Sequence, residues 1–258
     1  MPHIAQVAAF FGRPTPYLQR SYNIRLRCEI VREMLGNQTP ANILDIGCGN
    51  GSLSLQFLTD QNKLTLLDVS EEMLAIARLA IPNIHRSNVQ TVYGDLMTAD
   101  LPRGTFDLIL CMGVLAHVDS PEDIILKACS LLKDGGTIIV TVSCGRHFVG
   151  QLRKLYAWAR DILSPPLYRL KWIPLDGVLT ALVSQGLALQ KTFRYNFPAP
   201  GMDRLFTNES LYRTIRRRHG DVAKNRMAWL GSEHILLFTK SLSPLNTSLM
   251  QRDEDKAS

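Results

Sequence analysis

NILDIGCGNGSLSL, residues 42–55, decides the fold of this chain. An apolar run that contains Asp45 is followed by three alternating glycines and then by an apolar-periodic segment. This order predicts a buried strand, a tight turn and a helix. Glycines in the turn let the backbone adopt positive φ and let a ligand lie on the main chain, facing the free N–H groups of the helix end. The stretch therefore predicts a site for a nucleotide-like cofactor.

The spacing of the glycines argues against a dinucleotide. That fingerprint requires G-x-G-x-x-G or A at the start of the helix, with an acid about 20 residues further on. Here the sixth position counted from Gly47 is Ser52, and the glycines follow the pattern G-x-G-x-G. Asp45 would also repel a pyrophosphate, whereas a carboxylate suits a ligand that carries a positive ammonium or sulfonium group.

Further strand units follow the glycine loop, which we define as residues 47–51. Each unit combines a short apolar run with turn or helix-start residues. Ser70, followed directly by two acidic residues, predicts the start of a helix. The glycine pair at 135–136 separates a helix end from a fifth strand. The units lie at 63–68, 89–96, 106–112 and 131–140.

Three of the predicted strands end in an acid, namely Asp45, Asp68 and Asp95. A single acid at a strand end is more often a solvated loop residue or a helix cap than a ligand contact. Three in succession at carboxyl ends favour a site, because open parallel sheets bind ligands there. A carboxylate at the end of the second strand can accept hydrogen bonds from both hydroxyls of a ribose.

The glycine loop and the strand units that follow it resemble those of the class I S-adenosylmethionine-dependent methyltransferases. The likeness starts at Asp45–Gly51, which is similar to the first motif of that family, and continues in unbroken order over 41–145. It implies an α/β fold with a Rossmann-like, seven-stranded, mostly parallel sheet, helices on both faces and a helical lid. Met112–Val118 resembles the ubiquinone, menaquinone and magnesium-protoporphyrin O-methyltransferases and their small-molecule relatives.

The resemblance implies S-adenosyl-L-methionine as cofactor and assigns roles within the site. Asp95 would receive the adenine amino group, and the backbone N–H of Leu96 would bind a ring nitrogen. Met73 and Met112 would pack near the adenine, although methionine at such places is as often plain core. No metal site is expected. The expected cofactor residues are Asp45, Gly47, Cys48, Gly49, Gly51, Asp68, Val69, Met73, Asp95, Leu96 and Met112.

The chain is expected to divide into three parts. Residues 1–40 would form an N-terminal helical cap, 41–240 the methyltransferase domain, and 241–258 a disordered polar tail. Within the domain the core is 41–145, and the excursions 146–186 and 196–232 would form the lid and the acceptor site. The last strands are predicted at 187–195 and 233–240, with helices near 148–163, 176–185 and 208–219.

The composition is that of an ordinary globular protein. A length of 258 residues allows one α/β domain with elaborations. The five cysteines include no C-x-x-C pair and mostly lie inside apolar elements, which predicts small buried residues in a reducing compartment. Neither a signal peptide nor an apolar run near 18 residues is visible, so we expect a cytoplasmic protein.

Positive charge lies outside the expected cofactor core. Residues 1–145 carry 11 basic and 14 acidic residues, whereas 146–240 carry 16 basic and 6 acidic ones. The densest cluster, 213–219, is either a solvated helix face or a surface for an anionic acceptor, an acidic membrane or nucleic acid. Aromatic residues interleaved with Lys and Arg over 148–173 suit an interfacial helix, so peripheral membrane contact stays open.

Candidate contacts with the acceptor are aromatic or basic. In related enzymes the leading helices fold over cofactor and substrate, which makes Tyr17 and Tyr22 candidates, although packing against the core explains them equally well. The excursions add Trp158, Trp172 and Arg216. An apolar lid that carries arginines suits a bulky apolar acceptor, with or without carboxylates.

His117 is the expected general base. It lies five residues after Met112, near the end of the fourth strand and beside the glycine loop. Its ordinary pKa near 6.5 suits removal of a proton from a phenol, hydroxyl or amine. The alternatives are a histidine that packs in the fold or positions the substrate, and an ionised carboxylate acceptor would need no base.

The expected function is methyl transfer from S-adenosyl-L-methionine to a small, bulky, apolar and in some cases anionic acceptor, with O-methylation favoured, by in-line displacement. The alternatives are an RNA methyltransferase and a non-catalytic S-adenosylmethionine-binding regulator. No RNA-binding module and no Asn-Pro-Pro-Tyr type motif after the fourth strand is visible, which argues against nucleic acid. The sequence leaves the acceptor, its reacting atom and the oligomeric state open.

Overall fold

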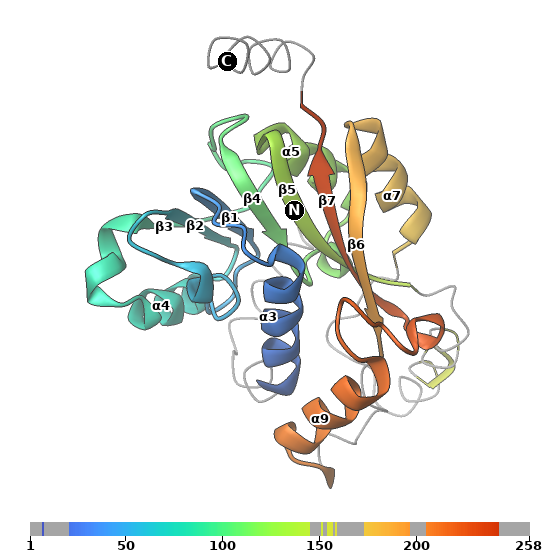
Figure 1. The fold of residues 1–258 in the computed structure, drawn as a ribbon. Helices are drawn as coiled ribbons and strands as arrows, with labels where there is room; N and C mark the ends of the chain where they lie inside the picture. Colours follow the sequence, from blue (N-terminus) through green and yellow to red (C-terminus); the bar gives the residue numbers. More distant parts are fainter. Residues whose placement is uncertain are drawn as a thin grey trace, which may run out of the picture.

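A mixed sheet forms the centre of the computed structural model, which describes residues 7, 21–144, 151, 154–156, 158, 173–196 and 205–242 (Figure 1). In this part of the chain the sheet has seven strands in the order β3-β2-β1-β4-β5-β7-β6. The neighbours are parallel except for β7, which is antiparallel to both of its partners. The expected seven-stranded, mostly parallel sheet is thus confirmed. The strands are β1 (Asn42–Ile46), β2 (Lys63–Asp68), β3 (Val89–Tyr93), β4 (Phe106–Cys111), β5 (Leu132–Ser143), β6 (Leu187–Tyr195) and β7 (Glu233–Lys240).

The apolar composition of the central strands explains their position. Every residue of β1 after Asn42 and of β2 after Lys63 is buried, as expected for parallel strands covered on both faces. The strand order reverses between β1 and β4, and ligands bind beside the carboxyl ends of strands at such a point. The helices are α3 (Ser21–Leu35), α4 (Glu71–Ala80), α5 (Pro121–Leu131), α7 (Leu175–Ser184) and α9 (Asn208–His219), with short 3₁₀ helices η1 (Leu55–Phe57), η2 (Asn83–Asn88), η3 (Leu115–His117) and η4 (Ala228–Leu230).

Helices cover both faces of the sheet (Figure 1). On one face α5 and α7 contribute Ile125 and Leu182 to a buried cluster. On the other, α3, α4 and α9 contribute Leu26, Leu74 and Ile215 to a second cluster. Although α7 lies in the segment expected to shape the lid and acceptor site, it packs against α5, because its apolar side chains recur at helical spacing.

The predicted boundaries agree with the structure for β2, β6, β7 and α9. The segment after the glycine loop differs, because turns and η1 stand where we expected a regular α-helix. Side chains donate hydrogen bonds to backbone carbonyl groups that would accept backbone hydrogen bonds in a regular α-helix. Cys28 Sγ donates to the Ser52 carbonyl at 3.5 Å, and Gln56 Nε2 donates to the Leu53 carbonyl at 2.8 Å.

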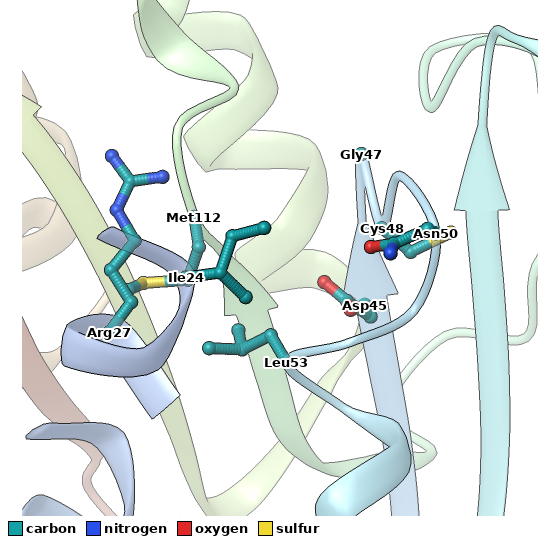
Figure 2. A pocket seen from close by; sticks show the side chains of 8 residues that line it. All are labelled: Ile24, Arg27, Asp45, Gly47, Cys48, Asn50, Leu53 and Met112. Carbon is teal, nitrogen blue, oxygen red and sulfur yellow. The ribbon is translucent and has the colours of Figure 1, made fainter. Parts of the chain in front are cut away.

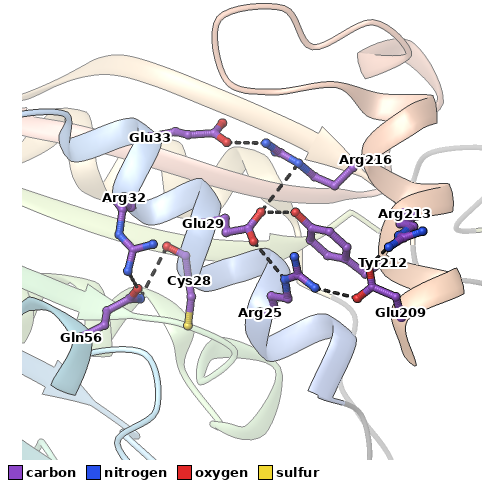
Figure 3. Close-up of polar contacts among 10 residues, drawn as sticks. All are labelled: Arg25, Cys28, Glu29, Arg32, Glu33, Gln56, Glu209, Tyr212, Arg213 and Arg216. Atoms are coloured by element: carbon purple, nitrogen blue, oxygen red, sulfur yellow. Dashed lines mark hydrogen bonds and ion pairs between the residues drawn. The ribbon is translucent and has the colours of Figure 1, made fainter. Parts of the chain in front are cut away.

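Charged side chains hold α9 against α3 (Figure 3). Arg216 of α9 forms an ion pair with Glu33 of α3, and the Tyr212 hydroxyl donates a hydrogen bond to Glu29. Arg25 lies over the Tyr212 ring, 3.9 Å from its centroid. Single exposed ion pairs add little stability. Together these contacts extend along more than two turns of α3 and fix the direction of α9.

Parts of the expected domain scheme lie outside the described residues. Of the N-terminal cap expected over 1–40, the structure describes residue 7 and the segment from 21 onward, which contains α3. Of the tail expected to be disordered, it describes 241 and 242. Among the described residues, no helix is both long enough and apolar enough to cross a membrane.

Candidate functional site

The glycine loop follows β1 at the carboxyl edge of the sheet. Gly47 and Gly49 have φ values of +64° and +55°, which confirms the positive φ predicted for this turn. The N–H groups of Gly47 and Cys48 both donate to the Leu67 carbonyl of β2, at 2.8 and 3.1 Å. A Cβ at residue 47 would lie 2.5 Å from Val114 Cγ2, in the turn after β4. The loop therefore lies tightly between its neighbours and has room only for glycine at position 47.

Asp68 ties this loop to the next unit. Its Oδ2 accepts a hydrogen bond of 2.7 Å from the Gly49 N–H, and its Oδ1 accepts one of 2.9 Å from the Ser70 N–H. Ser70 Oγ accepts from the Met73 N–H, which confirms the predicted start of α4. Burial raises the pKa of Asp68, and the hydrogen bonds from Gly49 and Ser70 oppose that rise. Each carboxylate oxygen keeps a lone pair for a further donor.

Asp45 is a buried carboxylate in the next-to-last position of β1. It is 2% exposed, and its Oδ2 has no hydrogen-bond partner among the described residues. Burial raises the pKa of Asp45 to about 7, while the Ser54 hydroxyl lowers it and the charge of Asp68 raises it. A carboxylate in this environment is stabilised as the anion by a cationic ligand.

A pocket lies between the glycine loop and α3 (Figure 2). Arg27 of α3 lines one side and Asp45 the other, with the apolar side chains of Ile24, Leu53 and Met112 between them. The other lining residues are Gly47, Cys48 and Asn50. A positive group on one side and a buried carboxylate on the other are complementary to the zwitterion of an amino acid.

The structure brings only part of the predicted cofactor set into this pocket. Its lining includes Asp45, Gly47, Cys48 and Met112, and Gly49 and Gly51 belong to the same loop. Asp68 and Val69 lie at the end of β2, Asp95 and Leu96 follow β3, and Met73 is buried in α4. The carboxyl end of β3 lies beside that of β2, since Tyr93 pairs with Asp68. Contacts of these residues with a cofactor stay predictions.

Sequence reasoning did not identify Arg27, Ile24 or Leu53 as part of the site. The sequence contains only a weak indication that Arg27 belongs to the site. It lies three residues after Ile24, on the same side of α3, and directly after the buried Leu26. A basic residue at the border of a buried helix face can indicate a site, but only the position of α3 over the sheet edge shows which one.

His117 lies at the end of η3, after the turn that follows β4. Its side chain is half-buried, and its backbone N–H donates to the Val114 carbonyl at 2.8 Å. Val114 is the residue that a Cβ at Gly47 would touch, so this turn lies against the glycine loop. The position beside the loop agrees with the expectation, whereas a role as base stays a prediction.

The candidate acceptor residues lie in different surroundings. Tyr22 is 6% exposed and belongs to the buried cluster of α3 and α9, which favours the packing alternative. Trp158 is 64% exposed. Arg216 is engaged with Glu33. Tyr17 and Trp172 lie outside the described residues, and none of the three described candidates lines the pocket beside the glycine loop.

Neither metal nor thiol chemistry is indicated in the described part of the chain. No group of three or more His, Cys, Asp or Glu side chains there could hold a metal ion. The described cysteines are free, and Cys48, Cys111 and Cys129 are buried. Burial raises the pKa of the Cys48 thiol, which keeps it protonated and makes it a poor nucleophile.

Comparison with known protein sequences finds similarity over the first part of the sheet. Residues 43–136 match the family described as "Methyltransferase domain". A ubiquinone biosynthesis O-methyltransferase of Sodalis glossinidius (strain morsitans) is 34% identical over 116 residues, which are 44% of this chain and 45% of that relative. The chain therefore matches less than half the length of this curated relative.

Solved structures share the fold over most of the chain. A methyltransferase of Thermotoga maritima, described as S-adenosylmethionine-dependent and a possible histamine N-methyltransferase, has a TM-score of 0.60 at 17% identity, over 91% of this chain and 99% of that one. Magnesium protoporphyrin IX methyltransferase of Synechocystis PCC 6803, with bound S-adenosylmethionine, has a TM-score of 0.60 at 14% identity, over 93% and 98%. At such identities the likeness establishes the fold alone.

Proposed function

We propose that this chain binds S-adenosyl-L-methionine and transfers its methyl group to a small molecule, because residues 43–136 match a family described as "Methyltransferase domain". One observation supports this above all. The buried carboxylate of Asp45 lies opposite Arg27 in a pocket beside the glycine loop. The methionine part of the cofactor carries an ammonium and a carboxylate, which match these two groups in sign.

Each side chain of the carboxyl edge then has a distinct role in binding. Asp45 binds the ammonium group, and Arg27 binds the carboxylate through charge-assisted hydrogen bonds. Asp68 accepts hydrogen bonds from the ribose hydroxyls with the lone pairs that Gly49 and Ser70 leave free. Asp95 and the Leu96 N–H bind the adenine at the end of β3, next to Asp68.

The sulfonium group of the bound cofactor supplies an electrophilic methyl carbon. The residues of this chain contribute chiefly by holding the acceptor atom in line with that methyl group and its sulfur, since alignment removes most of the entropic barrier. His117, beside the turn that touches the glycine loop, accepts the proton when the acceptor is a hydroxyl, phenol or amine.

We further propose a small, bulky, apolar and in part anionic acceptor, with transfer to oxygen favoured. Support comes from the curated relative named a ubiquinone biosynthesis O-methyltransferase. The structural neighbours are named for different acceptors, one as a possible histamine N-methyltransferase and the other as a magnesium protoporphyrin IX methyltransferase, so the shared fold does not select the acceptor. The excursions would select it, and the exposed Trp158 is compatible with contact to a membrane surface.

Transfer of labelled methyl groups tests the proposal directly. The full chain is incubated with S-[methyl-³H]adenosylmethionine and either a small-molecule extract or total RNA. We expect label in the organic-soluble small-molecule fraction, together with S-adenosylhomocysteine. Label in RNA would favour the RNA methyltransferase, and cofactor binding by calorimetry without any transfer would favour the regulator. Absence of cofactor binding would contradict all three.

A further inference from the structure

The carboxyl edge beyond β4 brings three polar residues into one row. Glu233, the first residue of β7, pairs in register with Ser143 of β5 on one side and with Tyr195 of β6 on the other. Residues paired in this way across antiparallel strands project from the same face of a sheet. This is the face that α3 covers, because Tyr195 and Leu26 belong to the same buried cluster.

Tyr195 connects this row to α3. Its ring is fully buried, and its hydroxyl donates a hydrogen bond of 3.2 Å to Asn23 Oδ1. The hydroxyl also hydrogen-bonds with Arg27, whose guanidinium can only donate. One hydroxyl group therefore donates to Asn23 and accepts from Arg27, two residues that lie one turn apart on α3.

Glu233 adds a buried negative charge beside Tyr195. It is 4% exposed, and its Oε2 accepts a hydrogen bond of 2.6 Å from Ser143 Oγ. Burial raises the pKa of Tyr195, the charge of Arg27 opposes that rise, and the charge of Glu233 adds to it. Both charges thus lie within electrostatic reach of the Tyr195 hydroxyl, and the carboxylate attracts the permanently charged guanidinium toward this row.

Arg27 is confined on another side as well. A Cβ at residue 113 would lie 2.9 Å from Arg27 Nη1, so the guanidinium packs against the backbone of Gly113, just after β4. A free arginine loses much rotamer entropy when it binds a ligand. The contacts with Tyr195 and Gly113 restrict the side chain before any ligand arrives, while it lines the pocket opposite Asp45.

We propose that Tyr195 and Glu233 are positioning residues that hold the Arg27 guanidinium oriented for the carboxylate of a bound amino-acid group. This role rests on the cofactor binding proposed above and extends it to the last strands of the sheet, outside the matched domain at 43–136. Those strands then contribute to affinity for the amino-acid part of the cofactor and not for its nucleoside part.

Two ligands that differ in the amino-acid part separate these contributions. S-adenosylhomocysteine carries the carboxylate and the ammonium, and 5′-methylthioadenosine lacks both. Tyr195→Phe removes the hydroxyl and keeps the ring, and Glu233→Gln removes the charge and keeps the shape. By isothermal titration calorimetry of the full chain, we expect each variant to bind S-adenosylhomocysteine about 5–20-fold more weakly. We expect the Kd of 5′-methylthioadenosine to stay within about twofold of the parent value.

Two further variants show whether the effect acts through Arg27. In an Arg27→Met background, Tyr195→Phe should not weaken S-adenosylhomocysteine binding further, because the guanidinium that it orients is gone. Tyr212→Phe is the matched control, since it also removes a tyrosine hydroxyl bound to α3, through Glu29, but away from the pocket. It should bind both ligands as the parent does.

An unchanged affinity for S-adenosylhomocysteine in both single variants would overturn the positioning role. So would an equal loss for both ligands, which would indicate a general effect on the fold. If Tyr195→Phe does not fold, Glu233→Gln alone decides between these outcomes. Failure of the parent chain to bind either ligand would contradict the proposed function itself, which keeps the two results distinguishable.

Discussion

Asp68 accepts a hydrogen bond of 2.7 Å from the backbone N–H of Gly49, so a side chain at the end of β2 sets the position of the loop after β1. The same carboxylate accepts a hydrogen bond from Ser70 at the start of α4. One residue therefore holds together three segments of the proposed cofactor site. Replacing it should change the geometry of the loop as well as any contact with a ribose.

Asp68→Asn should weaken S-adenosyl-L-methionine binding by about 1.5–3 kcal/mol, because the amide nitrogen cannot accept a hydrogen bond and the neutral side chain binds hydroxyls less strongly. Isothermal titration calorimetry measures this loss. Asp107→Asn is the matched control, because Asp107 also accepts a backbone hydrogen bond, from Asn42 at 2.9 Å, but at the amino end of the strands. Parent-like affinity of Asp68→Asn would contradict the ribose assignment.

Gly47→Ala should destabilise the fold and abolish cofactor binding. The left-handed conformation costs an L residue about 1–2 kcal/mol, and overpacking against Val114 adds about 1–3 kcal/mol. Gly104→Ala isolates the first contribution, since Gly104 has a φ of +62° and no atom within 4 Å of an added Cβ. Thermal unfolding and calorimetry of both variants check this. Equal stability of the two variants would show that the contact with Val114 is not restrictive.

Asp45→Asn should stabilise the ligand-free protein increasingly as the pH rises from about 4 to 7. Burial raises the pKa of Asp45 to about 7, so the unfolded chain loses this proton first and folding becomes less favourable across that window. Above pH 7 the full penalty of about 2–4 kcal/mol is present in the parent and absent in the variant. Urea unfolding of both proteins between pH 4 and 8 measures the difference.

The raised pKa of Asp45 also makes cofactor binding dependent on pH. A cationic ammonium requires ionised Asp45, so binding below pH 7 should release a proton, and affinity should fall by up to about tenfold per pH unit. Calorimetry in buffers of different ionisation enthalpy detects this proton. Asp45→Asn should bind more weakly and show neither effect. A pH-independent affinity of the parent between pH 5 and 7 would exclude the coupling.

The arginines of α9 should separate into two groups. Arg216→Gln breaks the half-buried ion pair with Glu33 and should lower the free energy of unfolding by about 1–2 kcal/mol. Arg217 and Arg218 are exposed, so replacing both by Gln should leave stability nearly unchanged. If the acceptor is anionic, the double variant should raise the acceptor KM and reduce its dependence on salt. An unchanged acceptor KM would show that Arg217 and Arg218 form a solvated helix face with no role in acceptor binding.

His117→Ala should lower kcat by at least about 100-fold and remove the acidic limb of the pH profile if the imidazole is the base. His117→Gln should behave in the same way, because its amide cannot accept the proton at neutral pH. Cofactor affinity, measured in parallel, should stay at the parent value. Activity within a few-fold of the parent would instead leave alignment of the reactants as the main source of catalysis.

Much of the sheet could be predicted from the sequence because each strand is a short apolar run bounded by polar or turn residues. Lys63–Asp68, Leu187–Tyr195 and Glu233–Lys240 are strands with the predicted ends for this reason. The glycine loop was predictable as well, since its positive φ values require glycine locally. These features depend on neighbouring residues in the chain, which the sequence displays directly.

The remaining features depend on contacts between distant segments. The 3₁₀ helix after the loop lies where Cys28 of α3, 24 residues away in sequence, donates a hydrogen bond to the Ser52 carbonyl group. Arg27 enters the pocket because α3 crosses the carboxyl edge of a sheet formed later in the chain. Arg216, which suggested a contact with an anion, is occupied by Glu33, 183 residues away in sequence. Periodicity and spacing carry no information about such partners.

The position of β7 has a consequence for the order in which the protein can form during synthesis. It is the last of the strands in the described part of the chain, yet it lies between β5 and β6. Until residues 233–240 have left the ribosome, β6 has no neighbour in the sheet and β5 exposes an apolar edge that includes Ile138 and Val140. A nascent chain therefore carries an open strand edge, the feature that promotes pairing between chains, for as long as β7 is missing. Insertion of β7 closes that edge and completes the row of Ser143, Glu233 and Tyr195 in the same step.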